Sequence, residues 1–108
     1  MYEEYFVESD WKMFNEKIAE WQEKYMEKLL KEYKEIISRK EEASKRFWEL
    51  EQRIKKDKNN PGVLIVSPSR SKLFFILVDL INDGVISFND LKDFSNKLID
   101  NLHRYLSI

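Results

Sequence analysis

The first 60 residues contain neither glycine nor proline, and this absence constrains the fold more than any other feature of the chain. All the residues of these two types lie between Pro61 and Gly84. From Asp10 to Asp57 the sequence is dominated by strong helix formers, above all Glu and Lys. Because nothing in this stretch obliges the chain to turn, it predicts helix over most of residues 10–57.

A capping-box sequence and the length of the stretch together predict a break in the helix near Ser38. Ser38-Arg39-Lys40-Glu41 has the spacing of a capping box, in which each side chain accepts a hydrogen bond from the other residue's amide. An unbroken helix over residues 10–57 would be about 72 Å long. We therefore expect a second helix over residues 40–57 that folds back on the first. The stripe before the break contains Trp11, Phe14, Ile18, Trp21, Tyr25, Leu29, Tyr33 and either Ile36 or Ile37, and the stripe after it contains Ala43, Phe47, Leu50 and Ile54.

The segment after Lys58 predicts a turn and then a connection without helix. Asn59-Asn60-Pro61-Gly62 is a strong stop signal, so residues 58–70 are expected to form a turn or an extended linker. The β-branched run Val63–Val66 predicts at most a small two-strand bridge with residues 85–86. A third helix, capped by Ser69 or Ser71, follows and carries the most apolar sequence of the chain, which predicts that it is the most buried.

Gly84 suits the left-handed position that ends this third helix. Ser87 is expected to cap a fourth helix whose inner stripe is Leu91, Phe94, Leu98, Leu102 and Tyr105. The sequence thus predicts an all-α protein with a single domain over residues 1–108. We expect an elongated bundle, in which a long N-terminal helical hairpin of residues 10–57 packs with a shorter C-terminal hairpin of residues 71–106.

The sequence contains no phosphate-binding loop and no pair of histidines with metal-ligand spacing. It has no Cys, and its one histidine, His103, is expected at the edge of a helix. The segment from Asp79 to Asp90 is similar to an EF-hand loop, but Ile81 stands where an oxygen ligand is needed and Asp90 is too short for the last ligand. We therefore expect no enzyme activity, no cofactor and no bound metal.

The same sequence argues against a membrane protein. The longest apolar stretch, Leu73–Val78, is far shorter than the roughly 20 residues that span a bilayer. The first ten residues include four acids and no base, unlike a signal peptide. Because the absence of Cys also fits a reducing compartment, we expect a cytoplasmic protein that does not act at a membrane.

Charge is unevenly distributed, although the whole chain has a net charge of -1. Residues 31–72 carry 12 bases and 7 acids. Two interpretations of this basic middle stay open: its cations offset the negative end of a helix, or they contact phosphates or an acidic partner. The cations of the segment 53–72 are Arg53, Lys55, Lys56, Lys58, Arg70 and Lys72.

Two adjacent aromatic residues give a second candidate for partner binding. Phe47 and Trp48 point about 100° apart on a helix, so both cannot face the same core equally. We predict that Trp48 is exposed and anchors a partner, because Trp is enriched at binding hot spots.

The function predicted from these features is a noncatalytic protein–protein interaction module. It would dock on another protein or form a homodimer, and its partner-binding residues would be Trp48 and the six cations of segment 53–72. The alternative is a small DNA-associated regulator that uses this basic segment to contact nucleic acid.

Two resemblances accompany these features. Gly84-Val85-Ile86-Ser87, followed by Asp90-Leu91, resembles the corner of the C-terminal helical hairpins called SHOCT, which implies an oligomerisation or docking element. The segments 14–21, 47–54 and 61–63, which read FNEKIAEW, FWELEQRI and PGV, resemble small uncharacterised helical proteins of phages and mobile elements of Gram-positive bacteria. This second resemblance implies an inhibitor or adaptor, of an anti-defence or antitoxin kind, that docks on a host protein complex.

Overall fold

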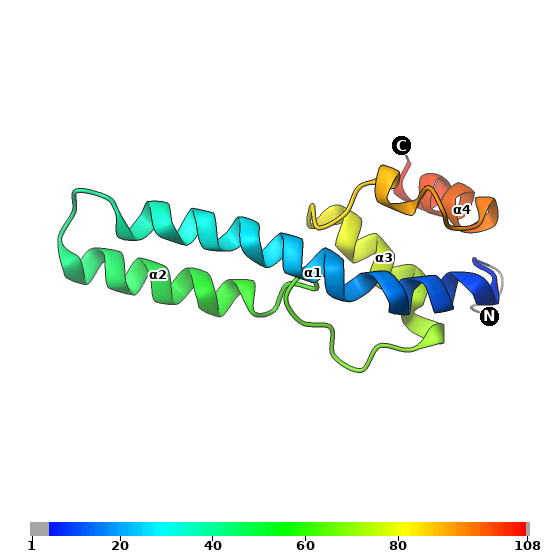
Figure 1. Cartoon of the computed structure of the whole chain (residues 1–108), viewed down its shortest axis with the longest axis horizontal. Coiled ribbons are helices and arrows are strands. Elements are labelled where there is room, and N and C mark those ends of the chain that lie inside the picture. Colours follow the sequence, from blue (N-terminus) through cyan, green and yellow to red (C-terminus); the bar gives the residue numbers. More distant parts are fainter. Residues whose placement is uncertain (1–4, 108) are drawn as a thin grey trace.

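The computed structural model describes residues 5–107, which form four α-helices and two short 3-10 helices without any strand (Figure 1). The radius of gyration is 16.7 Å and the molecule measures 53 × 26 × 23 Å. A compact domain of this length would have a radius of gyration of about 13 Å. The predicted elongated all-α bundle is therefore confirmed. The elements are α1 (Glu8–Ile37), α2 (Ala43–Asp57), η2 (Arg70–Lys72), α3 (Leu73–Asn82), η3 (Phe88–Leu91) and α4 (Asn96–Leu106).

Helix α1 runs along the molecule and has a different partner at each end (Figure 1). Its first half packs against α3 and α4, and we call this part of the molecule the body. Its second half lies antiparallel to α2, and we call this pair the hairpin. The 30 residues of α1 span about 45 Å, so the hairpin projects well beyond the body.

Helix α3 lies at the centre of the body, as its apolar sequence predicts. Six of its ten residues are buried. Within the described chain, no residue of α2 belongs to the main core cluster, so other contacts hold the hairpin together. The buried members of that cluster are Phe6, Phe14, Trp21, Leu73, Phe74, Ile76, Leu77, Val78, Leu80, Ile86, Leu91, Phe94, Leu98 and Leu102.

The break near Ser38 exists, but the predicted capping box is wrong. The Ser38 hydroxyl donates to the Lys34 carbonyl at 2.6 Å, so Ser38 ends α1 instead of starting α2. The Glu41 carboxylate pairs with Lys45 at 2.7 Å. Helix α2 begins at Ala43, three residues later than expected, with an extended Glu42 before it.

The connection from α2 to α3 contains turns and no strand within the described residues. The amides of Val63 and Leu64 both donate to the Asn60 carbonyl at 2.9 Å, which closes the chain into turns, as expected for a turn or extended linker, and the small bridge that the β-branched run allowed does not form among the described residues. The expected capping of α3 by Ser69 or Ser71 is also wrong. Helix η2 precedes α3, and neither serine accepts a helix-capping bond in the described contacts.

The predicted fourth helix is divided in two. Ser87 does form a capping box with Asp90, whose carboxylate accepts from the Ser87 amide at 2.8 Å, but this box starts only the short η3. Helix α4 starts later, at Asn96, after the N-cap residue Ser95. Gly84 has the expected positive φ, 73°. Tyr105 is exposed, so its predicted place on the inner stripe is wrong.

Candidate functional site

The side of α2 that faces α1 is polar. Near the connection, Arg39 Nη1 contacts Glu49 Oε2 at 2.5 Å. Arg46 Nη1 donates to the Ile37 carbonyl at 2.7 Å, and its Nε donates to the Glu41 carbonyl at 3.0 Å. The far end of the hairpin is thus closed by ion pairs and by an arginine that satisfies one carbonyl at the end of α1 and one in the connection to α2.

The same polar contact continues towards the body. Arg53 Nη2 pairs with Glu32 Oε1 at 2.7 Å and lies 3.5 Å from Asp57 Oδ2. The Tyr33 hydroxyl donates to Asp57 Oδ2 at 2.5 Å. We call these interhelical contacts the polar seam. Its members are Glu32, Tyr33, Arg39, Arg46, Glu49, Arg53 and Asp57.

The electrostatics of the polar seam follow from these contacts. The hydrogen bond to Glu32 raises the pKa of the Arg53 guanidinium above its ordinary value. Burial, followed by the hydrogen bond to Asp57, raises the pKa of Tyr33 from 10.0 to about 12. These groups therefore keep their protonated forms at neutral pH and serve to join the two helices.

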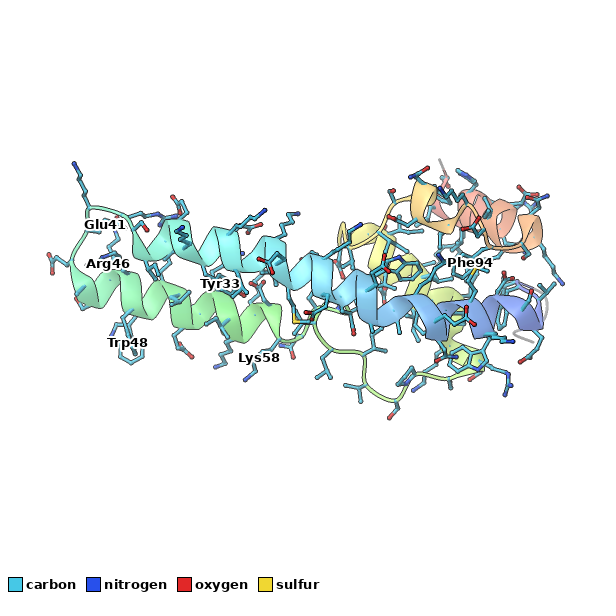
Figure 2. All side chains as sticks on the ribbon, viewed as in Figure 1. Tyr33, Glu41, Arg46, Trp48, Lys58 and Phe94 are labelled. Atoms are coloured by element: carbon cyan, nitrogen blue, oxygen red, sulfur yellow. The ribbon has the colours of Figure 1, made fainter. Side chains whose placement is uncertain are left out.

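Because polar residues fill most of the seam, most apolar side chains of α2 face solvent. Phe47 is 63% exposed and Ile54 is 39% exposed, whereas Leu50 is half-buried. The expectation that the stripe Ala43, Phe47, Leu50 and Ile54 forms the contact with α1 is therefore wrong for all of its members except Leu50. Trp48 is 60% exposed and lies edge-on to Phe47, with ring centroids 5.0 Å apart. Figure 2 shows Trp48 projecting from the side of α2 that is remote from α1.

Helix α1 adds apolar side chains beside this exposed stripe. Leu30 is 58% exposed and Ile37 is 47% exposed, and they lie seven residues apart on one side of α1. We define the hairpin face as Leu30, Tyr33 and Ile37 of α1 together with Phe47, Leu50 and Ile54 of α2.

The hairpin face is hollowed in two places that adjoin at Ile54 and Lys58. A hollow of about 510 Å³ follows α2 from Phe47 to Lys58. A second, of about 210 Å³, lies between the helices and is lined by Leu30 and Tyr33 from α1 and by Ile54 from α2. The face is therefore a shallow, largely apolar groove of the kind that accepts a helix.

The six cations of segment 53–72 do not form one patch. Arg53 is held in the polar seam, and Arg70 Nη2 pairs with Glu8 at 2.8 Å. Lys72 donates to the Ser67 carbonyl at 3.2 Å. The remaining cations, Lys55, Lys56 and Lys58, are exposed on α2 and at its end.

Lys55 and Lys58 line the larger hollow beside Phe47. Lys56 follows Lys55 by one position and so points about 100° away from it. The structure therefore places Trp48, Lys55 and Lys58 around the hairpin face and draws Arg53 and Arg70 into ion pairs elsewhere.

Leu30 is the member of the face that was not singled out in the sequence, whereas Ile37 was one of two alternatives for the end of the first stripe. The seven-residue spacing of Leu30 and Ile37 is a helical signal, but it lies beside the stripe that contains Leu29 and Tyr33. The position of α2 decides which of these two stripes is covered. Leu29 and Ile36 are buried, whereas Leu30 and Ile37 stay exposed.

The described residues contain no group of three or more His, Asp or Glu side chains placed to hold a metal ion. His103 stacks on Phe88, with ring centroids 3.8 Å apart. No helix in residues 5–107 combines the length and apolar character needed to cross a bilayer. Comparisons with family models, curated proteins and solved structures found no match to this chain.

Proposed function

We propose that this protein is a noncatalytic protein–protein interaction module that docks through its hairpin face and the adjoining Trp48. One observation carries the proposal: α2 turns its polar side towards α1 and its apolar side towards solvent. Phe47 and Ile54 contribute nothing to the body core, and an exposed apolar face rimmed by charges is typical of an interaction site.

The composition of the face supports this use. Phe47 and Trp48 offer large aromatic surfaces next to the aliphatic side chains of Leu30 and Ile54. Burying apolar surface stabilises a complex by about 25 cal/mol per Å², and aromatic residues dominate such interfaces. An inhibitor or adaptor of a mobile element, which the sequence resemblance implies, would act through a surface of this kind, and that role stays a prediction.

Site-specific photo-crosslinking in cells tests the proposal. A photo-reactive phenylalanine analogue at Phe47 should give a covalent adduct heavier than the 13.2 kDa chain. The matched control places the same analogue at Asp100, which is exposed on α4 in the body and should give far less adduct. Equal yields at the two positions, or no adduct at Phe47, would contradict docking through this face.

A further inference from the structure

The outer edges of the hairpin face carry the same charge pattern in both helices. On α1, Glu27 lies three residues before Leu30 and Lys34 lies four residues after it. On α2, Glu51 and Lys58 stand at the same spacing around Ile54. These positions place each acid and each base on the outer edge of the face, one turn before and one turn after the central apolar residue.

All four of these charged side chains are exposed, and none forms a salt bridge within the described part of the chain. We call Glu27, Lys34, Glu51 and Lys58 the rim charges. They therefore retain their full capacity to pair with charges on another molecule.

The register of the hairpin places the rim charges of α1 level with those of α2. Arg53 pairs with Glu32 across the seam, and the helices are antiparallel. Two residues further along each helix towards the connection, Glu51 therefore lies level with Lys34. Five residues in the opposite direction, Lys58 lies level with Glu27. The rim charges thus occupy the corners of a rectangle, and their signs alternate around it.

An alternating rectangle of this kind is complementary to itself. A two-fold axis parallel to the helices places Glu27 opposite Lys58 of a second copy and Lys34 opposite Glu51. A two-fold axis across the helices instead places Glu27 opposite Lys34 of the second copy. Either arrangement joins unlike charges at all four corners and buries both apolar faces, as an isologous interface requires.

We infer that the hairpin face is covered by the hairpin face of a second copy of this chain, which gives a four-helix arrangement around Leu30 and Ile54. This inference rests on the proposed docking function and names its partner. The face is about as long as α2, or 22 Å, and two helices wide, which is roughly 400 Å² for each copy. Standard interfaces bury about 800 Å² for each partner, so the dimer is expected to dissociate on dilution.

Sedimentation equilibrium of the full chain, from about 1 to 500 μM, tests the inference. The weight-average mass should rise from 13.2 kDa towards twice that value as concentration increases. A double variant, Leu30→Glu with Ile54→Glu, should stay monomeric while its circular dichroism remains helical, because both side chains are exposed in the monomer. A wild-type chain that stays at 13.2 kDa throughout would overturn the inference.

Two variants of the rim charges separate the self-complementary pattern from apolar contact alone. Glu27→Lys with Glu51→Lys makes all four corners positive, and the dissociation constant should rise roughly tenfold or more. Reversing all four signs, with Glu27→Lys, Lys34→Glu, Glu51→Lys and Lys58→Glu, restores complementarity and should return the dissociation constant to near the wild-type value. Equal dissociation constants for these two variants would overturn the inference.

The outcome is distinguishable from a failure of the proposed function. If the wild-type chain is monomeric but the probe at Phe47 captures a protein of a different mass, the face docks on another protein and the inference fails alone. If neither a dimer nor any adduct forms, both the inference and the proposed function fail.

Discussion

Asp10, in the first turn of α1, holds the start of α4 through Ser95. Its carboxylate accepts from the Ser95 amide at 2.8 Å and from the Ser95 hydroxyl at 2.6 Å, and it also accepts from the Val7 amide at 3.0 Å. The side chain of Asp10 is almost completely buried, with 1% of the residue exposed. One carboxylate thus satisfies the amides at the beginning of two helices that lie at opposite ends of the sequence.

Asp10→Ala is expected to lower the free energy of unfolding by about 2–4 kcal/mol, because the part-buried amides of Val7 and Ser95 both lose a charged partner and leaving a donor unsatisfied costs about 1–3 kcal/mol. Chemical denaturation followed by circular dichroism measures the change. Asp93→Ala is the matched control, because Asp93 is exposed and lies 4.0 Å from Lys17. An effect of Asp10→Ala no larger than that of the control would refute this role for the carboxylate.

Phe47→Ala is expected to change the free energy of monomer unfolding by less than about 0.5 kcal/mol, because the ring is exposed in the monomer. Leu98→Ala should lower it by about 2–5 kcal/mol, because Leu98 is fully buried in the body. Both values come from denaturation at a concentration low enough to keep the chain monomeric. A loss of several kcal/mol in Phe47→Ala would show that the ring belongs to a core.

Tyr33 makes the hairpin sensitive to high pH. Its pKa in the folded chain, about 12, is above the ordinary value of 10.0. The unfolded chain therefore loses this proton first, so the stabilisation by Tyr33 is complete below pH 10 and is lost as the pH rises towards 12.

Tyr33→Phe removes this titration, so its free energy of unfolding should fall less steeply between pH 10 and 12 than that of the wild type. Urea denaturation at a series of pH values measures both slopes. Identical slopes in the wild type and Tyr33→Phe would refute the role of the Tyr33–Asp57 hydrogen bond.

Binding to random duplex DNA is expected to be weak, with a dissociation constant of about 100 μM or more at physiological salt. Two of the cations that would contact phosphates, Arg53 and Arg70, already pair with Glu32 and Glu8. Fluorescence anisotropy at several salt concentrations measures the affinity. Tight binding that falls steeply with salt, and is lost in Lys55→Glu/Lys56→Glu, would instead favour the DNA-associated regulator.

The positions of the helices could be predicted from periodicity, but their ends and faces depend on contacts between distant residues. The apolar run of α3 and the positive φ of Gly84 are local signals, and both are confirmed. The start of α4 depends on Asp10, which lies 85 residues from Ser95 in the sequence. No local pattern around Ser95 reveals that bond.

The candidate site was predictable only in part, for the same reason. Trp48 is exposed as predicted, but Phe47 is exposed as well, so the local argument that only one of the two rings can face a core does not account for the face they form. The orientation of α2 follows instead from pairs such as Arg53–Glu32, whose members lie on different helices. An apolar stripe predicts that a helix has a face to cover, but it does not say whether the chain itself or another molecule covers that face.

The polar seam gives the two halves of the molecule different responses to ionic strength. The body is joined by apolar burial, which moderate salt leaves largely intact, whereas added ions screen the partly exposed pairs at Arg39 and Arg53. Amide hydrogens of α2 are therefore expected to exchange with deuterium faster in 1 M sodium chloride than at low salt, while those of α3 keep their protection. A hairpin that loosens at high salt while the body stays folded would be able to release its partner without unfolding the rest of the chain.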